Sequence, residues 1–198
     1  STPRPVHMPA IIDVGTGSGC IAVTLAAELP RAHVIAIDVS PAALRVARAN
    51  AQRQGVARRI AFHRGDLLSP VLPSLNPPTQ SCFHGRENMI APVIIIGNLP
   101  YLTTAEWRAL PRSLRMFEPR AAFDGGHDGI APFRTLFTQL KQLSTIHSPL
   151  STLLEIDPRR KRALGALVKK MLPNWEPAWH RDLAHRWRIL ELRTPSQN

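Results

Sequence analysis

A glycine-rich turn near the start of the chain constrains the fold more than any other feature of the sequence. The apolar run Ala10-Ile11-Ile12 leads through Asp13-Val14 into Gly15-Thr16-Gly17-Ser18-Gly19, and an Ala- and Leu-rich segment with helical spacing follows at residues 20–29. A short apolar run that ends in glycines predicts a buried strand, a tight turn and a helix. This order is typical of α/β sheets that bind ligands at their strand ends.

The rest of the chain continues the alternation of strands and helices. Apolar runs predict further strands at residues 33–37, 59–63, 92–96, 151–156, 175–180 and 186–192. Helical patterns are expected between them, at residues 42–54, 104–110, 129–144 and 158–171. The alternation predicts a doubly wound, Rossmann-like, mostly parallel sheet of seven strands in one domain over residues 1–198. Residues 69–91 hold four prolines without periodicity and predict a long loop.

Composition excludes several classes of protein. The sequence has no signal segment, and its apolar runs are too short to cross a membrane, so a cytoplasmic protein without membrane contact is expected. Two cysteines, Cys20 and Cys82, do not form a disulfide framework, and neither has metal-ligand neighbours. We therefore expect no metal site.

The chain is strongly basic, with a formal net charge of +11. The run Arg159-Arg160-Lys161-Arg162 predicts an exposed helix start that contacts an anionic partner such as ribosomal RNA. A solvated charged surface without a partner is the alternative, because charge alone specifies neither fold nor reaction.

Residues at the ends of the first three predicted strands have the chemistry to bind a nucleoside. The glycine spacing is GxGxG, which allows close backbone approach without the phosphate-binding spacing of dinucleotide sites. Asp38 ends the second strand and can accept hydrogen bonds from both ribose hydroxyls. Asp66 ends the third strand and can accept from an adenine amino group, with the Leu67 N–H as a neighbouring donor.

The tetrapeptide Asn98-Leu99-Pro100-Tyr101 follows the fourth strand and provides the candidate catalytic residues. The Asn98 side-chain oxygen and the Leu99 carbonyl can each accept one hydrogen of an –NH2 group. Pro100 stiffens the backbone that carries these acceptors, and Tyr101 can cover a planar group. Two such acceptors orient a nitrogen lone pair toward a methyl donor and stabilise developing positive charge. The sequence thus predicts methylation of an amide or amine nitrogen.

With these motifs placed, the sequence resembles the protein-glutamine N-methyltransferases, which have the class I S-adenosylmethionine-dependent fold. Segments 12–19, 38–44, 117–122, 124–129, 153–156 and 181–186 carry the resemblance. It implies methyl transfer to the glutamine of the Gly-Gly-Gln loop of a release factor, with S-adenosyl-L-homocysteine as product. It implies catalytic roles for Asn98, Leu99, Pro100 and Tyr101, and an S-adenosyl-L-methionine site formed by Asp13, Gly15, Thr16, Gly17, Gly19, Asp38, Val39, Asp66, Leu67 and Asn98.

The sequence departs from the family pattern at several points. Leu99 replaces the usual proline, Asp157 replaces the usual glycine after Leu-Glu-Ile, and we expect the N-terminal helical domain that recognises the substrate to be absent. Two alternatives therefore stay open. An rRNA or DNA adenine N6-methyltransferase is favoured by the charge and by Leu99, and a non-catalytic binding domain by the missing N-terminal region.

Overall fold

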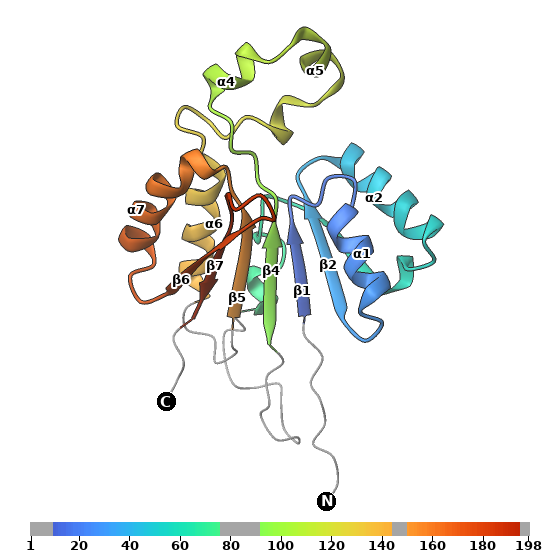
Figure 1. Cartoon of the computed structure of the whole chain (residues 1–198). Helices are drawn as coiled ribbons and strands as arrows, with labels where there is room; N and C mark the ends of the chain where they lie inside the picture. Colours follow the sequence, from blue (N-terminus) through green and yellow to red (C-terminus); the bar gives the residue numbers. More distant parts are fainter. Residues whose placement is uncertain (1–9, 76–91, 144–149, 195–198) are drawn as a thin grey trace, which may run out of the picture. The chain divides into compact units, whose positions relative to one another are not determined.

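The protein is described by a computed structural model that covers residues 10–75, 92–143 and 150–194. It has an α/β fold with a seven-stranded sheet in the order β3-β2-β1-β4-β5-β7-β6 (Figure 1). Strand β1 pairs in parallel with β2 and β2 with β3, whereas β6 and β7 are antiparallel. This confirms the predicted mostly parallel, doubly wound sheet. The strands are β1 (Ala10–Val14), β2 (His33–Asp38), β3 (Ile60–Arg64), β4 (Val93–Gly97), β5 (Leu150–Glu155), β6 (Glu176–Arg181) and β7 (Trp187–Arg193).

The helices agree with the predicted positions, with a few differences. They are α1 (Cys20–Glu28), α2 (Pro41–Arg53), α3 (Leu72–Leu75), α4 (Thr104–Ala109), α5 (Arg112–Phe117), α6 (Ala131–Gln142) and α7 (Lys161–Met171). Helix α5 was not predicted. Helix α3 lies inside the predicted 69–91 loop, and residues 76–91 of that loop lie outside the described part of the chain. The predicted 158–171 helix begins as a 3₁₀ turn, η3 (Pro158–Arg160), capped by the Asp157 side chain.

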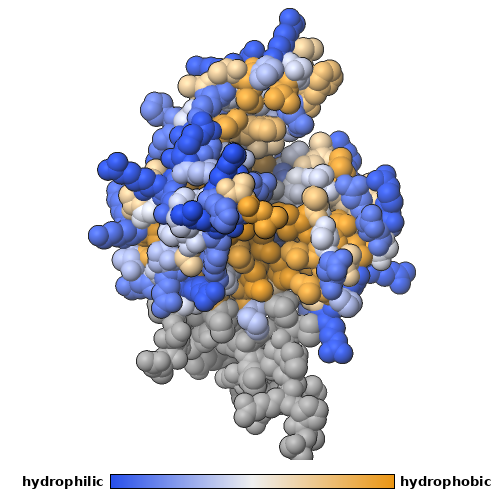
Figure 2. All heavy atoms as spheres, viewed as in Figure 1, coloured by the Kyte–Doolittle hydropathy of each residue, from blue (hydrophilic) through white to orange (hydrophobic). Residues whose placement is uncertain are grey.

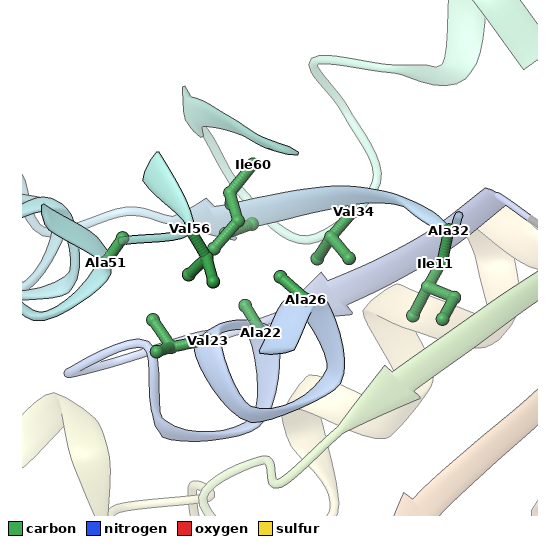
Figure 3. Close-up of a cluster of buried hydrophobic side chains, with 10 residues drawn as sticks. Ile11, Ala22, Val23, Ala26, Ala32, Val34, Ala51, Val56 and Ile60 are labelled. Carbon is green, nitrogen blue, oxygen red and sulfur yellow. The ribbon is translucent and has the colours of Figure 1, made fainter. Parts of the chain in front are cut away.

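The chain divides into two compact units, residues 1–96 with 143–151 and residues 97–142 with 152–198. In the first unit, α1 and α2 pack against the strands through a cluster of small and branched apolar side chains (Figure 3). Gly19 begins α1 in a left-handed conformation, and a Cβ there would lie 2.9 Å from the Cβ of Ala47 on α2. The small residues thus let the glycine turn and the two helices approach closely.

The core of the second unit lies between its long helices and its strands. Phe133, Leu136, Phe137 and Leu140 of α6 are fully buried, as are Leu190 and Leu192 of β7. Within this unit, α4 and α5 form a segment beyond the ends of α6 and α7, and Glu106 of α4 pairs with residues just before α7 (Figure 1). Among the described helices, none is long and apolar enough to cross a membrane.

Candidate active site

A buried carboxylate holds the glycine turn in place through hydrogen bonds. Asp13 is 1% exposed, and its Oδ2 accepts from Thr16 Oγ1 at 2.6 Å and from the backbone N–H of Ala22 at 3.1 Å. Burial raises the pKa of the Asp13 carboxyl, although these hydrogen bonds oppose the shift. Asp13 and Thr16, both predicted cofactor residues, thus share a hydrogen bond that fixes the turn. We interpret Asp13 as a residue that positions the turn.

Asp38 connects the glycine turn to the end of β2. Its Oδ2 accepts from the Gly17 N–H and its Oδ1 from the Ser40 N–H, each at 2.8 Å. An ionised carboxylate offers about four lone-pair sites, so both oxygens can accept further hydrogen bonds from a diol. A Cβ at Gly17 would meet no atom within 4 Å, so the space above the turn is open. Gly15 is exposed beside it, with φ 70°.

The remaining predicted nucleoside residues lie next to Asp38. The Gly65 N–H donates to the Asp38 carbonyl at 3.1 Å, which brings Asp66 to the end of β2. Asp66 is exposed, and Val39 is an apolar side chain that is 52% exposed. Leu67 has a buried side chain and a positive φ of 50°. The first unit therefore combines acceptors, an apolar surface and an open glycine turn, which suits a nucleoside.

In the second unit, the tetrapeptide presents an exposed polar side chain at its first residue. Asn98 is exposed, and no residue in the described ranges hydrogen-bonds to its side chain. Leu99 is 1% exposed, whereas Pro100 and Tyr101 are half-buried. The sequence argument used only the Leu99 carbonyl and did not anticipate that its side chain is anchored in the core. Because the buried Leu99 side chain fixes the backbone here, the exposed amide of Asn98 beside it can hold a ligand.

The segment around residues 123–129 fixes the backbone that follows the tetrapeptide. The Leu102 N–H donates to the Phe123 carbonyl at 3.0 Å, and the Gly125 N–H donates to the Leu102 carbonyl at 2.7 Å. A Cβ at Gly125 would lie 2.6 Å from the Pro100 carbonyl oxygen, and one at Gly129 would lie 2.5 Å from that of Tyr101. Only glycine allows this approach, so these glycines position the tetrapeptide.

Charged residues hold Tyr101 from the other side. The Arg160 Nε donates to the Tyr101 carbonyl at 3.3 Å, and its guanidinium pairs with Glu106. Burial and the neighbouring Glu155 carboxylate raise the pKa of the Tyr101 phenol. The phenol therefore stays neutral at physiological pH and suits a covering or donor role rather than that of a base.

Glu106 is the hub of this network and was not identified from the sequence. It forms a capping box with Thr103 at the start of α4 and pairs with both Arg159 and Arg160. Burial alone would raise the pKa of Glu106, but the Thr103 hydrogen bonds and the Arg160 charge outweigh burial and lower it. The Thr-x-x-Glu spacing could have revealed the capping box. The partners 53 and 54 residues away could not be read from spacing.

The predicted exposed run at residues 159–162 is only partly correct. The Arg160 side chain is 15% exposed, and Arg159 pairs with Asp157 as well as with Glu106. These two cations are therefore engaged within the chain. Lys161 and Arg162 are the members of the run that no carboxylate in the described ranges neutralises.

Comparisons with known proteins identify methyltransferases. A family model described as a methyltransferase domain matches residues 8–81. A release factor glutamine methyltransferase of Cereibacter sphaeroides is 34% identical over 94% of this chain and 60% of its own length. One from Geobacter sulfurreducens is 38% identical over 67% of this chain and 40% of its own length. The chain thus spans between 40% and 60% of the length of these two curated relatives.

Solved structures support the fold. The METTL16 methyltransferase domain superimposes with a TM-score of 0.61 at 15% identity, over 97% of this chain and 74% of that one. A methyltransferase from Pyrococcus furiosus gives 0.55 at 11% identity, over 96% and 78%. At these identities the likeness establishes the class I methyltransferase fold alone.

Proposed function

Because the chain has a class I methyltransferase fold and is homologous to the release factor glutamine methyltransferases, we propose that it methylates a protein glutamine. The methyl group comes from S-adenosyl-L-methionine, and the acceptor is the side-chain amide nitrogen in the Gly-Gly-Gln loop of a peptide-chain release factor. The observation that carries the proposal is the free, exposed amide of Asn98 on a rigidly held tetrapeptide.

The cofactor fits the residues of the first unit. The open space at Gly17, the Asp38 carboxylate and the exposed Val39 match a backbone-bound amino acid, a ribose diol and an adenine face. Asp66 would accept from the adenine amino group, and the Leu67 N–H would donate to the ring. S-adenosyl-L-methionine supplies an electrophilic methyl group when bound there and leaves as S-adenosyl-L-homocysteine. The prediction that Asn98 also contacts the cofactor is kept as part of this proposal.

The tetrapeptide residues act on the substrate amide by positioning. The amide nitrogen is a weak nucleophile because its lone pair is delocalised into the carbonyl. The Asn98 Oδ1 and the Leu99 carbonyl accept one N–H each, which directs the nitrogen lone pair toward the methyl donor. These acceptors also stabilise the positive charge that develops on nitrogen, and the proton then leaves to solvent. Pro100 limits backbone motion, and Tyr101 covers the amide plane.

The α4–α5 segment provides a surface for a protein substrate. Met116 and Phe117 are 63% and 83% exposed on α5, which also carries the basic residues Arg112 and Arg115. Figure 2 shows apolar residues at the surface of the α4–α5 segment. Such an exposed apolar pair suits contact with a folded partner. We expect the release factor to dock here and the protein to act in the cytoplasm. Contact of the basic surface with ribosomal RNA beside a bound release factor is part of the same proposal.

A second candidate is an adenine N6-methyltransferase that acts on rRNA or DNA. Leu99 and the net charge of +11 favour it, because an exocyclic amine presents the same two N–H groups to the tetrapeptide. A non-catalytic binding domain is the third candidate.

The deciding experiment offers labelled S-adenosyl-L-methionine with either purified release factor or ribosomal RNA. We expect label on the release factor, at the glutamine of the Gly-Gly-Gln loop, and none when that glutamine is replaced by glutamate. Label on adenine would establish the second candidate. Cofactor binding without transfer to either substrate would establish the third.

A further inference from the structure

The last two strands present two tryptophans and an arginine on one side of the sheet. Trp179 of β6 pairs with Leu190, and Arg181 pairs with Trp187 of β7. The register shifts between these pairs, so β7 has one extra residue, Arg188, in a bulge. Directly paired residues lie on the same face, and so do alternate residues of one strand. Trp179, Arg181 and Trp187 therefore share a face.

Cations from two elements lie over these indole rings. The Lys161 ammonium lies 5.0 Å from the Trp179 ring centroid and 4.2 Å from that of Trp187, and the Arg181 guanidinium lies 4.2 Å from the Trp187 centroid. In contrast to Arg159 and Arg160, neither Lys161 nor Arg181 pairs with a carboxylate in the described part of the chain. Their charges remain available to an anion.

A hollow open to solvent lies beside Trp179. Its volume is ≈ 460 Å³, and it is lined by Pro158, Arg159, Lys161, Arg162, Gly165 and Trp179. Gly165 lies inside helix α7, where a Cβ would be 3.7 Å from Cζ2 of the Trp179 ring. Glycine weakens a helix relative to alanine, but here it keeps the helix surface that lines the hollow beside the indole free of a side chain.

We propose that this surface, formed by Lys161, Arg162, Gly165, Trp179, Arg181 and Trp187, binds single-stranded nucleic acid. An unpaired base enters the hollow and stacks on Trp179, while Lys161, Arg162 and Arg181 contact the phosphates. Aromatic side chains within a basic groove are the usual means of holding a single strand. A duplex keeps its bases stacked internally, and the carboxylates of an acidic peptide do not stack on rings, so neither uses the indoles. The inference does not depend on methyl transfer.

The test uses the intrinsic fluorescence of the whole chain. Of its four tryptophans, Trp107 and Trp175 are buried at 6% exposure, so quenching reports mainly on Trp179 and Trp187. We expect oligouridylate of about 12 nucleotides to quench the signal with an affinity that falls as salt rises. Trp179→Ala should weaken binding roughly 5- to 150-fold without changing the salt slope, the range for one lost base stack. Trp179→Phe should recover part of the loss.

Two further variants separate the hollow from bulk charge. Gly165→Leu fills the hollow without changing any charge and should weaken binding, with helicity checked by circular dichroism. Lys161→Gln should weaken binding more than Lys170→Gln, the same change at an exposed position farther along α7. Equal binding by Trp179→Ala, or equally tight binding of polyglutamate or of a duplex of the same length, would overturn the proposal. Methyl transfer to a release factor should persist in Trp179→Phe, so the two functions can fail separately.

Discussion

Replacing Asp38 by asparagine tests whether one carboxylate both shapes the glycine turn and binds the cofactor. The two oxygens of Asp38 accept from different donors, Gly17 N–H and Ser40 N–H, each at 2.8 Å. Asparagine keeps one acceptor oxygen and turns its –NH2 group toward the other donor. A hydrogen bond to a charged group contributes about 1.5–3 kcal/mol, and partial exposure of Asp38 favours the lower value. We expect the free energy of unfolding to fall by about 1.5 kcal/mol.

The loss should be larger for the cofactor than for the fold. A ribose diol bound by asparagine loses a charged acceptor, so affinity for S-adenosyl-L-homocysteine should fall roughly 10- to 100-fold. Calorimetry measures the affinity, and urea unfolding with and without ligand measures stability. Glu28→Gln is the matched control, because it removes the same charge from an exposed position on α1. If Asp38→Asn matches that control in both measurements, Asp38 has neither role.

Three further predictions concern the second unit. Glu106→Gln should reduce the free energy of unfolding by about 1 kcal/mol at pH 7. The pKa of Glu106 in the folded protein lies below its ordinary 4.5, so this difference in stability should persist above pH 4.5 and vanish as the pH falls through the folded pKa. Urea titrations at several pH values measure it. Gly125→Ala places a Cβ 2.6 Å from the Pro100 carbonyl oxygen and should slow turnover by about 10- to 100-fold with cofactor affinity unchanged. Unchanged turnover would mean that the tetrapeptide tolerates displacement of its backbone. Phe117→Ser should raise the KM for release factor and leave kcat intact, and an unaltered KM would remove α5 from the docking surface.

The sequence predicted most of the fold because its signals are local. The glycine turn after β1 and the proline after Ser40 mark element boundaries directly. Helix α5 was missed because its six residues leave Met116 and Phe117 exposed, so they produce no amphipathic pattern. An exposed apolar helix can be recognised only when the tertiary structure is known.

The same distinction between local and tertiary signals applies to the candidate site. Asp38 and the Asn98 tetrapeptide could be predicted from the sequence because their residue types carry the chemistry. Their supports were not, because the contacts of Gly125 with Pro100 and of Arg160 with Tyr101 join distant segments. The predicted exposed charge at Arg160 failed for the same reason, since its partner Glu106 lies 54 residues away.

Single-turnover methylation of release factor by Asn98→Ala, with cofactor affinity measured in parallel, tests the central claim most directly. In the proposed mechanism, Asn98 accepts one N–H of the substrate amide, and it cannot act as a strong base. Its removal should therefore lower the rate roughly 10²- to 10³-fold, the effect of losing one preorganised polar contact, while S-adenosyl-L-methionine binds as before. Full activity in this variant would contradict the mechanism, and loss of cofactor binding would assign Asn98 to the cofactor site instead.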